Sequence, residues 1–263
     1  MRRAAAPSEG NHRAVDYHVH STFSIDGRSS IEDTCEMALR SGLGEIGFTE
    51  HMDFEPEEPG YGFLRYSEYS SAIAMVREKF EGRLTIRKGV EVDYQSRYVE
   101  AITEWLRGKE FDFAVGSVHF VNGKAIDLGN MDEETLRTLY PDYCREAILS
   151  IKSELFEVIG HFDLISSFCQ IPSEVKRKYT PSVIEALLDS KVYLEVNSRG
   201  FREGKKDTVP GRDILRDFFK KGGRRISIGS DAHSAELVGS GIHESLVLIG
   251  KLKPINLEFI FQA

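Results

Sequence analysis

The stretch DYHVHSTFSIDG, residues 16–27, places His18 and His20 two positions apart, with Asp26 six positions further on. A short apolar lead-in precedes the two histidines, which predicts that they lie on a β-strand. Side chains alternate between the two faces of a strand, so both imidazoles project from the same face. Such a pair is either an accident of packing or half of a metal site, and the rest of the chain has to decide between the two.

Strand and helix patterns alternate about seven times along the chain. The expected strands cover residues 14–20, 45–54, 84–94, 111–121, 156–165, 192–200 and 225–234. The expected helices cover residues 29–43, 66–82, 98–110, 131–155, 180–191, 210–223 and 241–253, with an interruption near Pro141 and with Pro181 at a tolerated early position. This alternation is typical of a parallel sheet with crossover helices, which either closes into a barrel or stays open as a doubly wound sheet.

The composition excludes several classes of protein. The chain has 263 residues, a length that one α/β barrel commonly reaches. Its formal net charge of −8 disfavours nucleic-acid binding, which usually needs a basic face. No apolar run approaches the roughly 20 residues that span a bilayer. Residues 1–13, which include His12, are expected to form a disordered tail ahead of a single domain, residues 14–263.

The cysteines indicate the compartment. Cys35, Cys144 and Cys169 are far apart and follow no paired spacing, which argues against a disulfide framework or a zinc knuckle. Such usage suits a reducing environment, and we expect a cytoplasmic protein.

Each expected strand begins apolar and ends in side chains that can bind a metal ion. These side chains are His18, His20, Glu50, His51, Glu91, Asp93, His119, His161, Asp163, Glu195, Asn197, Asp231 and His233. Six of the eight histidines fall in this set, whereas independent accidents would scatter them over helices and loops. The carboxyl ends of barrel strands meet on one face, so these residues are expected to converge there.

Taken singly, each motif has a plainer explanation. An H-x-H pair is more often incidental than a metal site, His119 can be a hydrogen-bonded core residue, and Asp231 can cap a helix. Taken together, buried carboxylates beside imidazoles need a compensating charge, which divalent cations supply. Imidazole with carboxylate suits zinc, manganese or iron, and the ligands are too many for one tetrahedral ion, so two or three ions are expected.

Such a cluster ionises water near neutral pH and neutralises the oxygens of a phosphoryl group. Hydrolysis of a phosphate ester is therefore the leading reaction class. Amide or lactone hydrolysis by an amidohydrolase-like barrel is the alternative on the chemistry of the site alone.

The ordered strings HVHSTFSIDG, GFTEHMDF, GVEVDY, GSVHFVNGKAID, IGHFDLI, EVNSRG and IGSDAH resemble the polymerase-and-histidinol-phosphatase (PHP) superfamily. GSVHF…ID and GHFDLI, with the chain length, resemble most its monofunctional histidinol-phosphatase branch. The resemblance implies an α/β fold, a distorted (β/α)7 TIM-like barrel, with a trinuclear metal site. It also implies hydrolysis of L-histidinol phosphate to L-histidinol and phosphate in histidine biosynthesis, with a metal-bridging hydroxide as the nucleophile.

Carried over by motif, the resemblance implies a ligand set for each ion. The first ion is assigned to His18, His20 and Asp231, with Glu91 bridging to the second. The second is assigned to Glu91, His119 and His161, and the third to His51, His233 and Asp26. Some family members have histidine at the position of Asp26. Glu91, Asp231 and His233 are expected to be the catalytic residues.

Four residues are expected to bind the substrate: Arg199, Glu50, Tyr61 and Phe63. Arg199 can hold a phosphate bidentately, the alternative being a solvated loop residue. Glu50 can meet the substrate ammonium group, or it can orient the imidazoles together with Asp163. Tyr61 and Phe63, with Tyr66, lie in the acidic and aromatic stretch DFEPEEPGYGFLRYSEY, which is either a lid or a surface loop.

Two rival functions stay open. A PHP-type phosphoesterase acting on nucleotides or another small phosphate ester would need a basic groove, but the basic clusters 205–206 and 224–225 fit solvated turns better. A metal-dependent binding module without catalysis would lack a ligand, and here the expected set is complete. We therefore expect a small phosphate ester as partner, with no nucleic acid and no membrane, and leave homo-oligomerisation open.

Overall fold

The computed structural model describes residues 14–126 and 131–261. The strands are β1 (Ala14–Val19), β2 (Leu43–Met52), β3 (Thr85–Asp93), β4 (Phe113–Ser117), β5 (Phe120–Val121), β6 (Lys124–Ala125), β7 (Val158–Ile159), β8 (Tyr193–Asn197), β9 (Arg225–Gly229) and β10 (Glu258–Phe259). The helices are α1 (Ile31–Arg40), α2 (Tyr66–Lys79), α3 (Val99–Leu106), α4 (Glu133–Lys152), α5 (Ser173–Leu188), α6 (Arg199–Arg202), α7 (Arg212–Lys220) and α8 (Ile242–Leu252). Short 3-10 turns lie at Ser96–Tyr98, Leu164–Ser167 and Ala235–Leu237.

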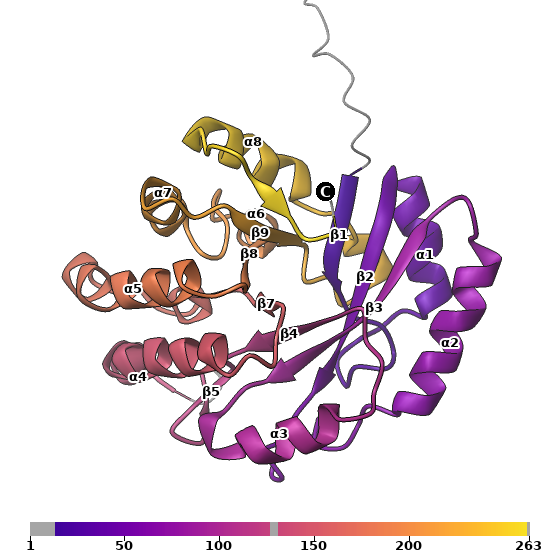
Figure 1. Cartoon of the computed structure of the whole chain (residues 1–263), viewed down its shortest axis with the longest axis horizontal. Coiled ribbons are helices and arrows are strands. Elements are labelled where there is room, and N and C mark those ends of the chain that lie inside the picture. Colours follow the sequence, from indigo (N-terminus) through magenta and orange to yellow (C-terminus); the bar gives the residue numbers. More distant parts are fainter. Residues whose placement is uncertain (1–13, 127–130, 262–263) are drawn as a thin grey trace, which may run out of the picture.

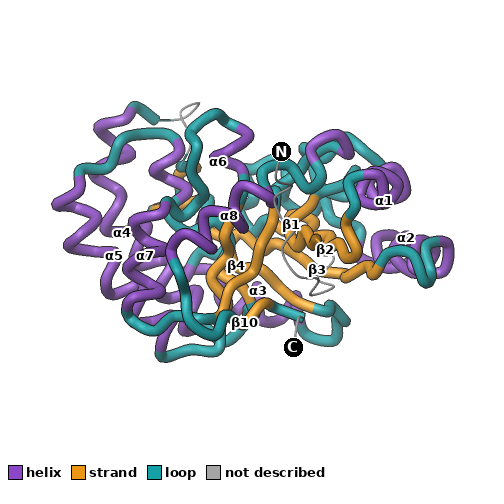
Figure 2. Tube along the Cα trace, turned by 90° about the horizontal axis from the view of Figure 1, so that it is seen from above, coloured by secondary structure: helices purple, strands orange, loops and turns teal. Residues whose placement is uncertain are grey.

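One parallel sheet organises these elements, in the order β1-β2-β3-β4-β7-β8-β9-β10. The sheet curls, and the helices lie outside it, with α1 and α2 beyond one part of the curve and α4, α5 and α7 beyond another (Figures 1 and 2). Each crossover helix returns the chain so that the next strand runs parallel to the last. The predicted α/β fold, a distorted (β/α)7 TIM-like barrel, is confirmed.

The curve closes where β1 meets the segment after β9. Val19 forms a parallel bridge with Ala232, and the amide of His20 donates to the carbonyl of Ala232 over 2.8 Å. In return, the amide of Asp231 donates to the carbonyl of His18 over 2.8 Å. This seam joins the carboxyl end of β1 to the segment that follows β9.

The short strand β10 was not predicted. It pairs with the start of β9, at Arg225 and Ile226, and brings Phe261 against the rings of Tyr17 and Phe113. These residues belong to a small apolar cluster. Two residues of strand are too short for a period-two pattern to appear, which explains why the sequence did not indicate β10.

Two larger apolar clusters bind the helices to the sheet. One packs α1 and α2 on β2 and β3, through residues such as Ala38, Ile73, Phe48 and Val90. The other packs α4, α5 and α7 on the half of the sheet that contains β8. Helices therefore bury the outer face of these strands, which leaves the inner face and the strand ends for polar side chains.

The expected helix boundaries differ from the structure at two prolines. Helix α4 runs without interruption through Pro141, and α5 begins at Ser173, so Pro181 lies inside it and not near its start. A proline inside a helix leaves the carbonyl four residues earlier without its amide donor. Those carbonyls belong to Arg137 and Arg177, both exposed, so water can replace the missing donor.

The expected tail, residues 1–13, lies outside the described residues, and a single domain from residue 14 to 263 stays a prediction. Within the part of the chain that is described, no helix combines the length and the apolar character needed to cross a bilayer.

Gly229 makes the closing seam possible, because a Cβ there would lie 2.3 Å from the Cβ of His18 and 2.7 Å from Oε1 of Glu195. We expect Gly229→Ala to lower the free energy of unfolding by about 1–3 kcal/mol through overpacking. Urea unfolding followed by circular dichroism measures it. Gly250→Ala in α8, with open space around the position, is the matched control and should be neutral or stabilising by up to about 1 kcal/mol. Equal stability of the two variants would mean that the seam tolerates a side chain.

Candidate metal centre

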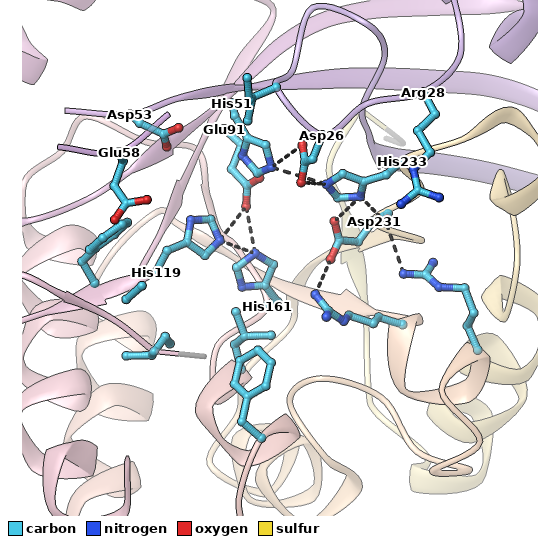
Figure 3. Close-up of a pocket in the computed structure, with 18 residues that line it drawn as sticks. Asp26, Arg28, His51, Asp53, Glu58, Glu91, His119, His161, Asp231 and His233 are labelled. Carbon is cyan, nitrogen blue, oxygen red and sulfur yellow. Dashed lines mark hydrogen bonds and ion pairs between the residues drawn. The ribbon is translucent and has the colours of Figure 1, made fainter. Parts of the chain in front are cut away.

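A cavity of about 540 Å³ opens over the carboxyl ends of the strands (Figure 3). Its polar lining consists of Asp26, Arg28, His51, Asp53, Glu58, Glu91, His119, His161, Arg199, Arg202, Asp231 and His233. Its apolar lining consists of Ile25, Phe120, Ala125, Ile126, Leu164 and Phe168. Six of the thirteen side chains expected at the strand ends therefore line one cavity, although they come from different strands.

The carboxylate of Glu91, on β3, lies at the centre of the cluster and is fully buried. Five imidazoles surround it. Their nearest ring nitrogens lie at these distances from its oxygens: His161 at 2.8 Å, His51 at 3.1 Å, His18 at 3.2 Å, His20 at 3.4 Å and His119 at 3.7 Å. One side chain thus reaches groups from β1, β2, the end of β4 and the end of β7.

Two further carboxylates complete the cluster on the side of the seam. Oδ1 of Asp231 lies 3.6 Å from Nε2 of His20 and 3.5 Å from Nδ1 of His233. Asp26 reaches His233 at 3.0 Å and His51 at 3.6 Å, and its side chain is about half exposed. Figure 3 shows Asp26 within reach of both His51 and His233, and Asp231 next to His233.

Three overlapping groups of side chains have ligand atoms close enough together to hold a metal ion. They are His18, His20 and Asp231; His18, Glu91 and His161; and His20, His51 and His233. In each group the ligand atoms lie within 4.8 Å of one another. The seven residues of these groups, together with Asp26 and His119 beside them, are the nine predicted ligands.

Hydrogen bonding leaves several of these atoms in need of a cation. Nδ1 of His18 lies 2.7 Å from Oε1 of Glu195, so this nitrogen donates and Nε2 is the atom left to bind a metal ion. That Nε2 faces Glu91 at 3.2 Å and Asp231 at 3.8 Å. Among the described residues, Nε2 of His18, Nε2 of His20 and Oε2 of Glu91 are buried without a hydrogen-bond partner. Lone pairs facing carboxylate oxygens repel unless a positive charge lies between them, so the residues fit divalent metal ions.

The surroundings divide the protonation states of the rings. Burial acts to lower the pKa of His18 and of His51, but Glu195 and Glu91 raise the pKa of His18 well above its ordinary value and Glu91 raises that of His51 to about 10, so each of these rings carries a proton that a metal ion would displace.

Burial lowers the pKa of His119 to about 3 and that of His20 well below its ordinary value, so both rings are neutral. Burial acts to raise the pKa of Glu91, but attraction to neighbouring rings, first that of His18, outweighs it and holds the pKa well below the ordinary range. The same balance lowers the pKa of Asp231. Neutral imidazoles and ionised carboxylates are the forms that bind metal.

Three strand-end carboxylates lie around the cluster and not in it. Glu195 accepts from Nδ1 of His18 and from the amide of His161. Asp93 accepts from the amide of His119 over 3.2 Å. Asp163 turns to Tyr140 at 2.8 Å and to Lys176 at 2.6 Å, away from the imidazoles. The sequence could not separate these roles, because a ligand and the group that orients it share one position at a strand end.

The four residues predicted to bind substrate divide into two groups. Arg199 lines the cavity and contacts Asp231 at 3.5 Å. Glu50 is fully buried, and Tyr61 and Phe63 lie elsewhere, with Tyr61 53% exposed. None of these three is part of the cavity lining, so the structure does not bring the aromatic residues of the proposed lid to the site.

Several lining residues were missed. Arg202 follows Arg199 by three positions, which on the short helix α6 places both on one side. Asp53 follows His51 by two positions, the spacing that also pairs His18 with His20. These two periodicities could have indicated them. Glu58, Arg28 and Phe168 lie on loops, where no regular spacing applies.

The chain is similar in sequence to proteins of known family. A family model described as PHP domain matches residues 16–199. The Histidinol-phosphatase of Lactococcus lactis subsp. lactis (strain IL1403) is 30% identical over 251 residues and is covered to 91%, as is this chain. A protein of Thermotoga maritima named Probable histidinol-phosphatase is 26% identical, with 94% of both chains covered.

A solved structure extends the likeness to three dimensions. It is the histidinol phosphate phosphatase (HISK) of the same Lactococcus lactis strain, in complex with zinc, L-histidinol and phosphate. The match has a TM-score of 0.81 and 28% sequence identity, and it covers 93% of this chain and 95% of the other.

His119 tests the cluster, because it lies at its edge and its removal leaves the seam intact. We expect His119→Ala to weaken metal binding at least ~10-fold and to lower activity with it. Metal content after gel filtration, measured by plasma mass spectrometry, checks the expectation. His243→Ala, on the exposed side of α8, is the matched control and should keep the wild-type content. If His119→Ala also kept it, His119 would not be a ligand.

Proposed function

The chain belongs to the PHP domain family, in its histidinol-phosphatase branch, and from this premise we propose that it hydrolyses L-histidinol phosphate to L-histidinol and inorganic phosphate. The observation that carries the proposal is the near-complete coverage of a relative and of a solved structure that bear this name. A phosphoesterase acting on nucleotides or another small phosphate ester is the alternative.

We propose three divalent ions, zinc, manganese or iron, held by the nine residues assigned above. The three ligand groups support this number, and Glu91 lies where it can bridge between ions. When bound, such ions supply hydroxide from water near neutral pH and neutralise phosphoryl oxygens in the transition state. Glu91, Asp231 and His233 contribute by fixing the position of that positive charge.

The arginines of the cavity are suited to the phosphate. Arg199 lies beside Asp231, at the edge of the cluster, and its guanidinium can take phosphate oxygens bidentately. Arg202 is held by the carbonyls of Ser230 at 2.7 Å and Asp231 at 3.2 Å, so it braces the loop that carries Asp231. Arg28 lies on the same flank of the cavity in Figure 3. Together they place positive charge where the ester phosphate would lie.

The opposite flank is acidic. Asp53 and Glu58 lie across the cavity from Arg28, as Figure 3 shows. Neither carboxylate forms an ion pair with a cation of the described residues. Leu164 and Phe168 also line the cavity. L-Histidinol phosphate is an anion at one end and carries an ammonium and an imidazole at the other. The charge distribution of the cavity therefore matches this substrate better than a nucleotide, whose far end carries no ammonium.

The three cysteines are buried and unpaired, which supports the proposal of a reducing, cytoplasmic location.

A phosphate-release assay tests the substrate. With zinc or manganese, we expect kcat/KM for L-histidinol phosphate to exceed that for a mononucleotide and for p-nitrophenyl phosphate by about 100-fold, because a site that pairs with substrate polar groups rejects analogues lacking them. Treatment with a chelator should abolish release, and added metal should restore it. Equal, slow turnover of all three esters would reject the substrate and leave the class of hydrolase standing.

Glu58→Gln tests the acidic flank. We expect kcat/KM for L-histidinol phosphate to fall about tenfold, mainly through KM, because a charge-assisted contact with the ammonium is lost. Turnover of p-nitrophenyl phosphate, which has no ammonium, is the internal control and should not change. A parallel loss with both esters would show that Glu58 supports the site in general and does not recognise the cation.

A further inference from the structure

Ser24 lies on the loop after β1, fully buried beneath His20. Its hydroxyl oxygen has three polar neighbours. Nδ1 of His20 lies at 3.0 Å, the backbone nitrogen of His51 at 2.9 Å and Oε2 of Glu50 at 2.7 Å. One hydroxyl therefore connects two proposed metal ligands, from two strands, with a carboxylate outside the cavity.

The position of the proton on His20 follows from its surroundings. Nε2 lies 3.4 Å from Glu91 and 3.6 Å from Asp231, yet among the described residues it has no partner in hydrogen-bonding geometry. A proton on Nε2 would be buried without an acceptor, whereas a proton on Nδ1 points at Ser24. The ring therefore carries its proton on Nδ1.

The hydrogen-bonding positions of the Ser24 hydroxyl are then all occupied. It can accept two hydrogen bonds and donate one. The amide of His51 and Nδ1 of His20 both donate to it, which uses both lone pairs. Its own proton must go to Glu50. Glu50 is held in place in turn by Ser21, through its hydroxyl at 2.6 Å and its amide at 3.0 Å.

We propose that Ser24 and Glu50 are positioning residues that fix the tautomer of His20, so that its Nε2 presents a lone pair to the metal ions. The same hydroxyl ties down the end of β2 at His51, so it sets the relative position of two ligands. This role replaces contact between Glu50 and the substrate ammonium, because Glu50 does not line the cavity. The inference rests on the metal centre of the proposed function, but not on the identity of the ester.

The test is zinc affinity, measured by competition with a chelating dye. We expect Ser24→Ala to weaken zinc binding about 10- to 100-fold, the usual cost of removing a partner that orients a ligand. Ser21→Ala is the matched control, because it removes a hydroxyl that donates to the same carboxylate but contacts no imidazole. It should leave the affinity within about threefold of wild type. Equal affinities for the two variants would overturn the proposal.

A second measurement does not depend on any variant. In the zinc-loaded wild-type protein, nitrogen-15 NMR of the imidazole rings should show the proton of His20 on Nδ1 and the metal on Nε2. The reverse assignment would overturn the proposal even if Ser24→Ala did not fold. Both readouts are independent of L-histidinol phosphate. If L-histidinol phosphate is not the substrate, these two readouts still test the tautomer of His20. If these readouts contradict the proposal, the phosphate-release assay still tests the substrate.

Discussion

One buried carboxylate within reach of five imidazoles is the contact on which this structure depends. Burying Glu91 with no positive charge beside it would be costly, and the rings around it offer lone pairs as well as protons. Only added cations satisfy all of these atoms at once. The sheet must therefore bring β1, β2, β3, β4, β7 and β9 to one point at their carboxyl ends, and the parallel order of the strands does so.

Around this centre the charges are separated. Arg199 lies beside Asp231, the carboxylates of Asp53 and Glu58 lie across the cavity from Arg28, and apolar side chains such as Phe168 also line the cavity. Five of the nine proposed ligands are buried: His18, His20, Glu91, His161 and Asp231. In the proposed function, recognition of the substrate would fall mainly to the segments after β2, β7 and β8, which carry Glu58, Phe168 and Arg199. Chemistry and recognition are therefore assigned to different parts of the chain, as is common for barrel enzymes.

The sequence was most informative where spacing is regular. Period-two pairs at strand ends, such as His18 with His20 and Asp231 with His233, indicated both the strands and the cluster, and the nine predicted ligands lie together. The spacing did not distinguish the roles of individual residues at the strand ends. Glu195 and Glu91 occupy equivalent places at strand ends, and only the three-dimensional distances show that the first touches Nδ1 of His18 and the second Nε2. Loop residues follow no period, so Glu58 was missed and Tyr61 was assigned to a site that it does not line. The start of α5 was predicted too late, at residue 180, because a proline is expected near the beginning of a helix. The helix begins at Ser173 instead, since water can replace the donor that Pro181 lacks at the exposed carbonyl four residues earlier.

The seam between β1 and the end of β9 has a consequence for how the protein is made. Ligands from the first strand emerge from the ribosome long before Asp231 and His233, so a nascent chain can display His18 and His20 without being able to complete the centre. The proposed metal centre therefore cannot form, and the protein cannot be active, until the segment after β9 has left the ribosome. In the proposed centre, an ion held by His18, His20 and Asp231 would fasten the oldest part of the chain to the newest, in addition to the hydrogen bonds of the seam.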